Sequence, residues 1–180
     1  MPHKVLLVDD EPRLLEGLQR ALRKEPYQIV TASSAEDALG ILRSDSVDVV
    51  ISDQDMPGTT GTEFLARVHQ EYPDTVRFIL TGHATLEVAI QSINDGAISR
   101  FFTKPCNPID LAVTIRQALQ HKDLMAEADR LRQTTKRQSA LIERLEQDHP
   151  GITKIEKDAS GAIIMKLDPP GNDEPISGAR

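Results

Sequence analysis

Acidic side chains stand directly after two apolar runs of the sequence. Asp9 and Asp10 follow the first run, and Asp53 and Asp55 follow the third. Carboxylates that gather in one place repel one another unless a cation neutralises them, and Mg2+ is the hard cation that takes a few oxygen ligands and keeps several waters. A carboxylate beside Mg2+, with an ammonium and a hydroxyl in reach, is equipped to accept a phosphoryl group.

The elements that must position these acids are predicted by the alternation of short apolar runs with segments of helical periodicity. The expected strands are Lys4–Val8, Tyr27–Ala32, Val47–Ser52, Val76–Leu80 and Arg100–Thr103. The expected helices are Pro12–Lys24, Ala35–Arg43, Thr62–Glu71 and Leu86–Asp95. The runs lack strict alternation of apolar and polar residues, which is typical of strands covered on both faces. We therefore expect an α/β fold with a doubly wound parallel sheet.

The residues that follow the carboxyl ends of these strands are expected together at one edge of the sheet. Ligands of such sheets bind beyond the carboxyl ends of the strands. Thr81 follows the fourth run and Lys104 follows the fifth, so both are expected beside the four acids. Each acid taken alone is an ordinary solvated turn residue. Their joint occurrence at the strand ends favours a site for phosphoryl transfer.

Four motifs, in order, resemble the receiver domain of bacterial two-component response regulators. They are Val8–Pro12 (VDDEP), Ile51–Asp53 (ISD) with Met56, Pro57 and Gly61, Leu80–Gly82 (LTG) and Phe102–Pro105 (FTKP). The resemblance covers residues 3–120 and implies a flavodoxin-like fold with five parallel strands in the order 2-1-3-4-5. It also implies a phosphorelay partner, a histidine kinase. The chain would be no enzyme beyond catalysing its own aspartyl phosphorylation and dephosphorylation.

The resemblance implies a role for each acid. Asp53 is the expected phosphoacceptor. Asp10, Asp53 and the backbone carbonyl of Asp55 are the expected Mg2+ ligands, and Asp9 is expected to act largely through these ligands without touching the metal.

Further residues are expected to complete and tune the site. The resemblance implies that Thr81 hydrogen-bonds the phosphoryl oxygen and that Lys104 pairs with it. Thr81 and Phe101 would form a switch, which rests on packing because Phe101 lacks a tyrosine hydroxyl. Asp55 and His83 occupy the positions that tune hydrolysis of the acyl phosphate, although a solvated loop histidine is the alternative reading of His83.

A long helix is predicted after the receiver, because no Gly or Pro occurs between Pro108 and Pro150 and Asn107 supplies a cap. Spacings of four and three relate Leu124, Ala128, Leu131, Thr135, Gln138, Ile142 and Leu145. No second helix is expected to cover this seam, which favours a parallel coiled-coil homodimer over packing on the receiver. Thr135 and Gln138 weaken its middle, which suits an equilibrium that phosphorylation biases.

These patterns divide the chain into four expected regions. The receiver occupies residues 1–120, and a coiled-coil helix continuous with the fifth receiver helix occupies 121–149. A β-hairpin is expected at 150–167, where two short apolar runs flank a turn that ends in Gly161. The remaining residues, 168–180, are rich in Pro, Gly and charge and are expected to be disordered.

Composition restricts the possible partners. The net charge of -7 and the aromatic content of 3% argue against a broad nucleic-acid surface. The single cysteine excludes an intrachain disulfide. No run approaches the roughly 18 apolar residues of a membrane span. We therefore expect a cytoplasmic protein without a membrane partner.

Two other functions match parts of the sequence. No helix-turn-helix pattern follows the receiver, so we expect output through an unknown protein partner, with a transcription regulator that binds DNA through its C-terminal part as the alternative. Asp53-Gln54-Asp55 also resembles the first motif of haloacid-dehalogenase-like phosphatases. That motif is expected near the start of a chain, and Pro57 breaks its pattern.

Overall fold

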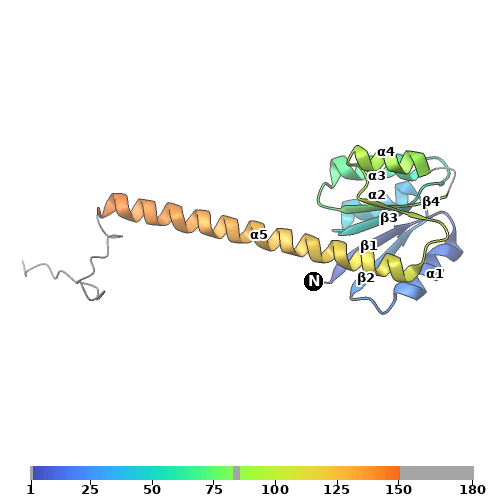
Figure 1. Ribbon diagram of the computed structural model, residues 1–180, viewed down its shortest axis with the longest axis horizontal. Coiled ribbons are helices and arrows are strands. Elements are labelled where there is room, and N and C mark those ends of the chain that lie inside the picture. Colours follow the sequence, from blue (N-terminus) through green and yellow to red (C-terminus); the bar gives the residue numbers. More distant parts are fainter. Residues whose placement is uncertain (1, 83–85, 151–180) are drawn as a thin grey trace, which may run out of the picture. The chain divides into compact units, whose positions relative to one another are not determined.

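The computed structural model describes residues 2–82 and 86–150, and five strands form one parallel sheet (Figure 1). The strands are β1 (His3–Val8), β2 (Tyr27–Ala32), β3 (Val49–Asp53), β4 (Val76–Thr81) and β5 (Arg100–Thr103). Their order is β2-β1-β3-β4-β5, and every pairing is parallel. The predicted flavodoxin-like α/β fold with strand order 2-1-3-4-5 is confirmed.

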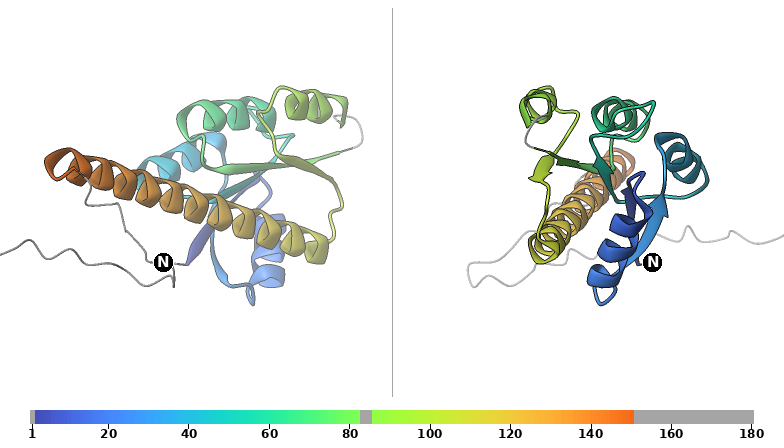
Figure 2. Two further views of the ribbon diagram at one scale, coloured as in Figure 1. Left: turned by 60° about the vertical axis from the view of Figure 1, so that its left-hand side comes forward. Right: turned by 90° about the vertical axis from the view of Figure 1, so that its right-hand side faces the viewer.

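Helices cover both faces of the sheet (Figure 2). They are α1 (Pro12–Leu22), α2 (Ala35–Ser44), α3 (Gly61–Glu71), α4 (Leu86–Asn94) and α5 (Pro108–Asp148). Side chains of β1 alternate between two apolar clusters: Leu6 and Val8 pack with α2 and α3, whereas Val5 and Leu7 pack with α1 and the start of α5. A strand buried on both faces needs apolar residues at successive positions, which explains the continuous run in the sequence.

Side chains fix the starts of three helices. Ser34 Oγ accepts a hydrogen bond from the Asp37 backbone N–H at 3.1 Å at the start of α2. Asn107 Oδ1 accepts one from the Ile109 N–H at the start of α5. A reciprocal capping box, which the sequence analysis missed, joins Thr60 to Glu63 before α3. It starts α3 at Gly61, one residue before the predicted start.

The start of β3 differs from the prediction. The sequence suggested Val47, whereas pairing with β1 begins at Val49 opposite Val5. The carbonyl of Val47 instead accepts a hydrogen bond from the Thr75 hydroxyl at 2.9 Å. A side chain from the next loop therefore takes the place of a strand partner.

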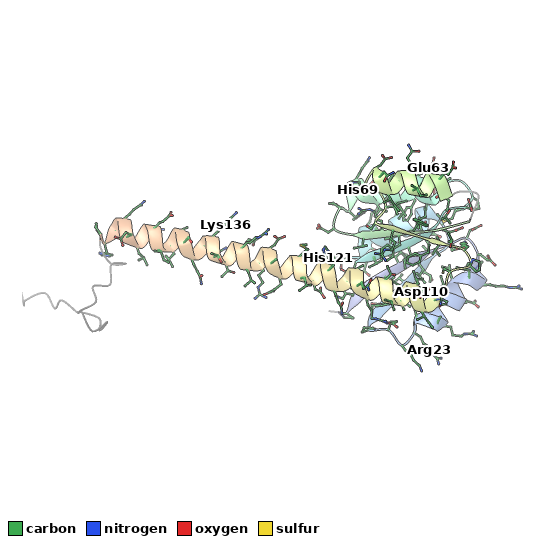
Figure 3. All side chains as sticks on the ribbon, in the orientation of Figure 1. Arg23, Glu63, His69, Asp110, His121 and Lys136 are labelled. Carbon is green, nitrogen blue, oxygen red and sulfur yellow. The ribbon has the colours of Figure 1, made fainter. Side chains whose placement is uncertain are left out.

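The predicted long helix is confirmed, because α5 runs unbroken through 41 residues, about 60 Å at the usual rise. His121 and Lys136 lie on this helix and are labelled in Figure 3.

The chain divides into two compact units, Met1–Ala126 and Glu127–Arg180, and the expected receiver boundary at residue 120 lies inside the first unit. Apart from Pro150, the expected hairpin (150–167) and tail (168–180) lie outside the described residues. None of the helices in the described part combines the length and apolar composition that a membrane crossing requires.

Gly61 offers a test of how tightly α3 approaches β3. A Cβ added at Gly61 would lie 2.1 Å from the backbone oxygen of Asp53, so Gly61→Ala must displace backbone. We expect the substitution to lower the free energy of unfolding by about 1–3 kcal/mol in urea titrations. Gly40→Ala is the matched control, because nothing lies within 4 Å of its added Cβ in the middle of α2. This control should be about 0.5–1 kcal/mol more stable than wild type; equal losses in both variants would contradict the close approach.

Candidate functional site

The carboxyl edge of the sheet brings three acids together. Asp9 and Asp10 follow the end of β1, and Asp53 is the last residue of the neighbouring strand β3. One carboxylate oxygen from each lies within 4.8 Å of those of the other two. Asp9 is 2% and Asp53 3% exposed, whereas Asp10 faces solvent. The structure thus joins acids that are more than forty positions apart in the sequence.

Lys104 supplies the positive charge of this group. Its Nζ lies 2.6 Å from Asp53 Oδ1 and 3.0 Å from Asp9 Oδ2, while Asp9 Oδ1 accepts the Glu11 backbone N–H at 2.8 Å. Burial works to lower the pKa of Lys104, but its hydrogen bonds to Asp53 and Asp9 outweigh burial and raise that pKa above its ordinary value. The lysine therefore stays an ammonium, held between two buried carboxylates.

The Asp53 carboxyl is in an unfavourable position for a charge. Burial raises its pKa above the ordinary aspartate value, and the nearby Asp9 adds to this rise against the opposing effect of Lys104. Beyond its ion pair with Lys104, Asp53 Oδ1 is buried and accepts no hydrogen bond of ordinary geometry from the described residues. The Lys104 ammonium is thus the group that compensates the charge on this buried oxygen.

The donor set fits Mg2+. Asp10 and Asp53 offer hard carboxylate oxygens, and the exposure of Asp10 leaves room for the waters that Mg2+ retains. Asp55 also has an exposed side chain, and the ligand expected from it is its backbone carbonyl. Both oxygens of Asp9 are already engaged by Lys104 and Glu11, and the indirect role expected of Asp9 stays a prediction.

Gln54 fixes the loop between the two acids of the third motif, a role that the sequence analysis missed. Its side chain is 5% exposed, and its Oε1 accepts the Thr62 N–H at 3.1 Å. Its backbone N–H donates to Leu80 at 2.9 Å, and its carbonyl accepts from Gly61 at 3.1 Å. The loop after β3 is therefore tied to both β4 and α3. The one available signal was a long polar residue between two functional acids.

The expected switch residues lie on neighbouring strands. Thr81, the last residue of β4, is fully buried and pairs in register with Thr103, while Ile79 pairs with Phe101. Because side chains alternate along a strand, Thr81 and Phe101 share one face of the sheet. Phe101 is half-buried and packs against the cluster beneath α2 and α3. The other tuning candidate, His83, lies outside the described residues.

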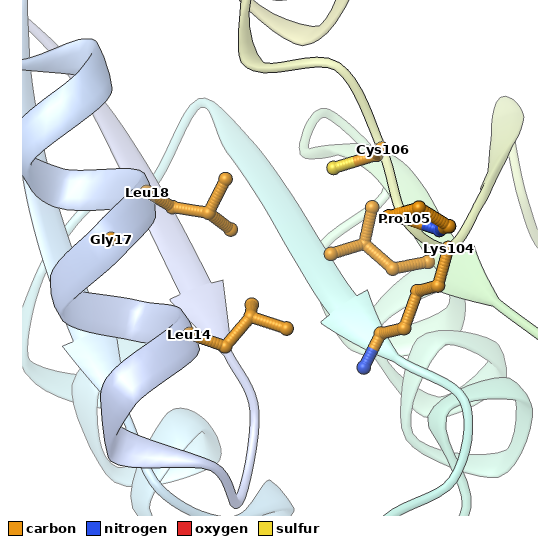
Figure 4. Close-up of a pocket in the computed structure, with 7 residues that line it drawn as sticks. Leu14, Gly17, Leu18, Lys104, Pro105 and Cys106 are labelled. Carbon is orange, nitrogen blue, oxygen red and sulfur yellow. The ribbon is translucent and has the colours of Figure 1, made fainter.

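An apolar pocket of about 500 Å³ opens beside Lys104 (Figure 4). Its lining comes from α1, the end of β4 and the turn after β5: Leu14, Gly17, Leu18, Leu80, Lys104, Pro105 and Cys106. Burial raises the pKa of the Cys106 thiol, which keeps the thiol neutral in this apolar lining. The pocket provides apolar surface next to the acid cluster.

Comparison with known proteins identifies the fold and site together. Residues 5–116 match the response regulator receiver domain. The chain belongs to this receiver family. Two-component signalling is therefore its setting, histidine kinases are the partners of such domains, and receivers bind Mg2+ through an acidic pocket such as that of Asp9, Asp10 and Asp53.

Several relatives are longer regulatory proteins, of which this chain matches one part. The chain is 39% identical over 127 residues to the hydrogenase transcriptional regulatory protein HoxA of Cupriavidus necator, matching 71% of this chain and 26% of that protein. It is 35% identical over 144 residues to the transcriptional regulatory protein GlrR of Escherichia coli K12, matching 80% of this chain and 32% of that protein. The chain thus spans about a quarter to a third of the length of these relatives.

A solved receiver has the same architecture. The signal receiver domain of an HD domain-containing protein from Pseudomonas fluorescens Pf-5 is 40% identical, with a TM-score of 0.65. The match covers 68% of this chain and 98% of that structure. The receiver part of this chain therefore accounts for almost all of that domain.

The raised pKa of Asp53 predicts the effect of removing its charge. A carboxyl whose folded pKa is raised destabilises the fold above that pKa, and the effect disappears below its unfolded pKa. Without metal at neutral pH, Asp53→Asn should therefore raise the unfolding temperature by roughly 2–5 °C, and the gain should shrink on acidification.

Mg2+ should stabilise the wild-type receiver but not Asp53→Asn in the same calorimetric measurement. Asp95→Asn, with an exposed side chain, is the control and should behave as wild type. Equal stabilisation of wild type and Asp53→Asn by Mg2+ would remove Asp53 from the metal site.

Proposed function

We propose that this chain is a phosphorylation switch in which Asp53 accepts a phosphoryl group from a histidine kinase. The observation that carries the proposal is the buried Asp53 carboxylate, 2.6 Å from the Lys104 ammonium and beside two further acids. The apolar pocket next to Lys104 offers surface on which a phosphodonor protein can dock.

The residues of the site suit this transfer. An Asp53 oxygen forms the new bond to phosphorus as the bond from phosphorus to the donor nitrogen breaks. The Lys104 ammonium, which Asp9 holds in place, neutralises charge on the transferred oxygens, and the Thr81 hydroxyl donates a hydrogen bond to one of them. Bound Mg2+ would supply further neutralisation of the phosphoryl oxygens. The chain catalyses only its own phosphorylation and its reversal.

A small phosphodonor with Mg2+ tests the acceptor directly. Intact-protein mass spectrometry should show one labile phosphoryl group per wild-type chain, none on Asp53→Asn, and unchanged uptake by Asp95→Asn. Lys104→Met should slow uptake roughly 100-fold, because it removes a fixed positive charge from the transition state. Uptake that persists in Asp53→Asn would end the assignment, and continuous phosphate release would indicate a phosphatase instead.

The C-terminal half of α5 presents the means of output that we propose. Seam residues Leu124, Leu131, Ile142 and Leu145 are 70%, 58%, 52% and 40% exposed. Large apolar residues at heptad spacing are covered when a second copy packs against them. Glu127 comes directly before the seam residue Ala128, and Arg132 comes directly after the seam residue Leu131. These two positions face each other across a parallel dimer, so opposite charges would lie side by side there.

Phosphorylation would reach this seam through the switch pair. A phosphoryl group on Asp53 draws Thr81 toward it, and Phe101 on the same sheet face moves into the space behind it. The surface formed by α4, β5 and the start of α5 then repacks, and α5 continues into the seam. Such coupling is worth a few kcal/mol at most, so it biases an existing dimer equilibrium.

Sedimentation of the full chain tests the seam. Wild type should be dimeric, and Leu131→Asp combined with Leu145→Asp should be monomeric, because the four aspartates of a dimer would meet in the seam. Gln133→Asp combined with Ala140→Asp is the matched control: it adds the same charge to exposed positions on the opposite helix face and should remain dimeric. A wild-type chain that is monomeric with and without phosphorylation would contradict this output.

The transcriptional alternative stays open because the relatives HoxA and GlrR are named as transcriptional regulatory proteins. Retention of DNA by the phosphorylated full chain, lost at raised salt, would favour it. The phosphatase alternative has little support, because Asp53 ends β3, the third strand along the chain, and the receiver family covers residues 5–116.

A further inference from the structure

His3 bridges two carboxylates at the amino end of the sheet, the edge opposite Asp53. Its Nδ1 lies 3.2 Å from Asp48 Oδ2, in the loop before β3, and its Nε2 lies 3.1 Å from Asp123 Oδ2 on α5. The His3 side chain is 29% exposed, so water and protons reach it. This contact joins residues 120 positions apart, immediately before the seam residue Leu124.

The two distances constrain the protonation of the ring. A neutral imidazole has one N–H donor and one acceptor nitrogen, whereas an imidazolium has two donors. A carboxylate oxygen only accepts, so a neutral His3 would set an unprotonated nitrogen against one of its two partners. The bridge is complete only when His3 carries its extra proton.

Asp48, one partner of His3, also has two other partners. Asp48 Oδ1 pairs with Lys122 Nζ at 2.7 Å, and Asp48 Oδ2 accepts the Lys4 backbone N–H at 2.9 Å. Burial works to raise the pKa of Asp48, but the hydrogen bonds from Lys122 and Lys4 outweigh burial, so this pKa lies below its ordinary value. Asp48 therefore stays an anion at neutral pH.

Two other side chains complete the surroundings of the bridge. The Lys4 ammonium pairs with Asp45, and Tyr27 of β2 is the strand partner of His3. Three cations then face three anions when His3 is protonated, and one anion is left over when it is not.

We propose that His3 is a pH-sensitive clamp that fastens the α5 turn at Lys122 and Asp123 to the sheet edge. With His3 protonated, two contacts hold this turn: Lys122 to Asp48, and His3 to Asp123. When His3 loses its proton, its ring no longer offers a positive charge to Asp123 and keeps a donor for only one of its two partners, so Lys122–Asp48 is then the one ion pair of the two. The clamp thus sets how firmly the receiver is joined to the start of the seam. It goes beyond the proposed phosphorylation switch and does not depend on it.

Hydrogen exchange of the full chain, followed by mass spectrometry over residues 119–126, tests the clamp. At about pH 5.5, wild type should exchange roughly two- to fivefold more slowly than His3→Gln, the range expected of a partly exposed ion pair. At about pH 8, where histidine is neutral, the two should exchange alike. Comparison at equal pH cancels the chemical pH dependence of exchange. Asp123→Asn should reproduce His3→Gln, and the control His121→Gln, in the same turn of α5, should match wild type.

Two results would overturn the clamp. One is equal exchange of wild type and His3→Gln at both pH values, and the other is a difference that persists unchanged at about pH 8. Nitrogen NMR of the His3 ring in the wild-type chain provides a second reading, because a singly protonated ring at about pH 5.5 would also exclude the bridge. The exchange measurement is repeated in chains that also carry Leu131→Asp and Leu145→Asp. This comparison separates the effect of the clamp from the effect of dimerisation through the seam.

Discussion

Two carboxylates buried side by side, with one ammonium between them, are the constraint on which the receiver depends. Asp9 and Asp53 are brought together because β1 and β3 are neighbours in the sheet. Lys104 comes from β5, two strands away from β3, a separation of about 10 Å. A long side chain that crosses the end of β4 is therefore required, and the strand order 2-1-3-4-5 is what allows one lysine to reach both acids.

The elements around this group keep it in a state that suits a switch. Gln54 and Gly61 tie the loop after β3 to β4 and α3, which helps to hold Asp53 in place beside Asp9. Burial raises the pKa of Asp53 above its ordinary value, and Lys104 offsets this rise only in part. Functional sites commonly give up stability in this way. The buried surroundings of Asp53 disfavour its ionised carboxylate. A phosphoryl group or a cation bound at Asp53 therefore removes or neutralises an unfavourable charge.

The elements follow largely from the sequence, which also predicts the site residues. Continuous apolar runs marked strands covered on both faces, and the absence of Gly and Pro between Pro108 and Pro150 marked the long helix. Asp53, Thr81 and Lys104 stood out because each lies at the carboxyl end of its strand or directly after it, so a local motif carries the information. The heptad spacing of the seam is local in the same sense, whereas the partner that covers it stays a prediction.

Only the tertiary structure decided the contacts between residues distant in the chain. The His3 bridge to Asp48 and Asp123, and the close approach of Gly61 to Asp53, have no local signature. Arg77 lies inside an apolar run, yet its guanidinium is buried and donates to the carbonyl oxygens of Thr75 and Ala97. Periodicity reports which face of an element is covered; it carries no information on which atom of another element lies there, because that depends on how the sheet and helices pack.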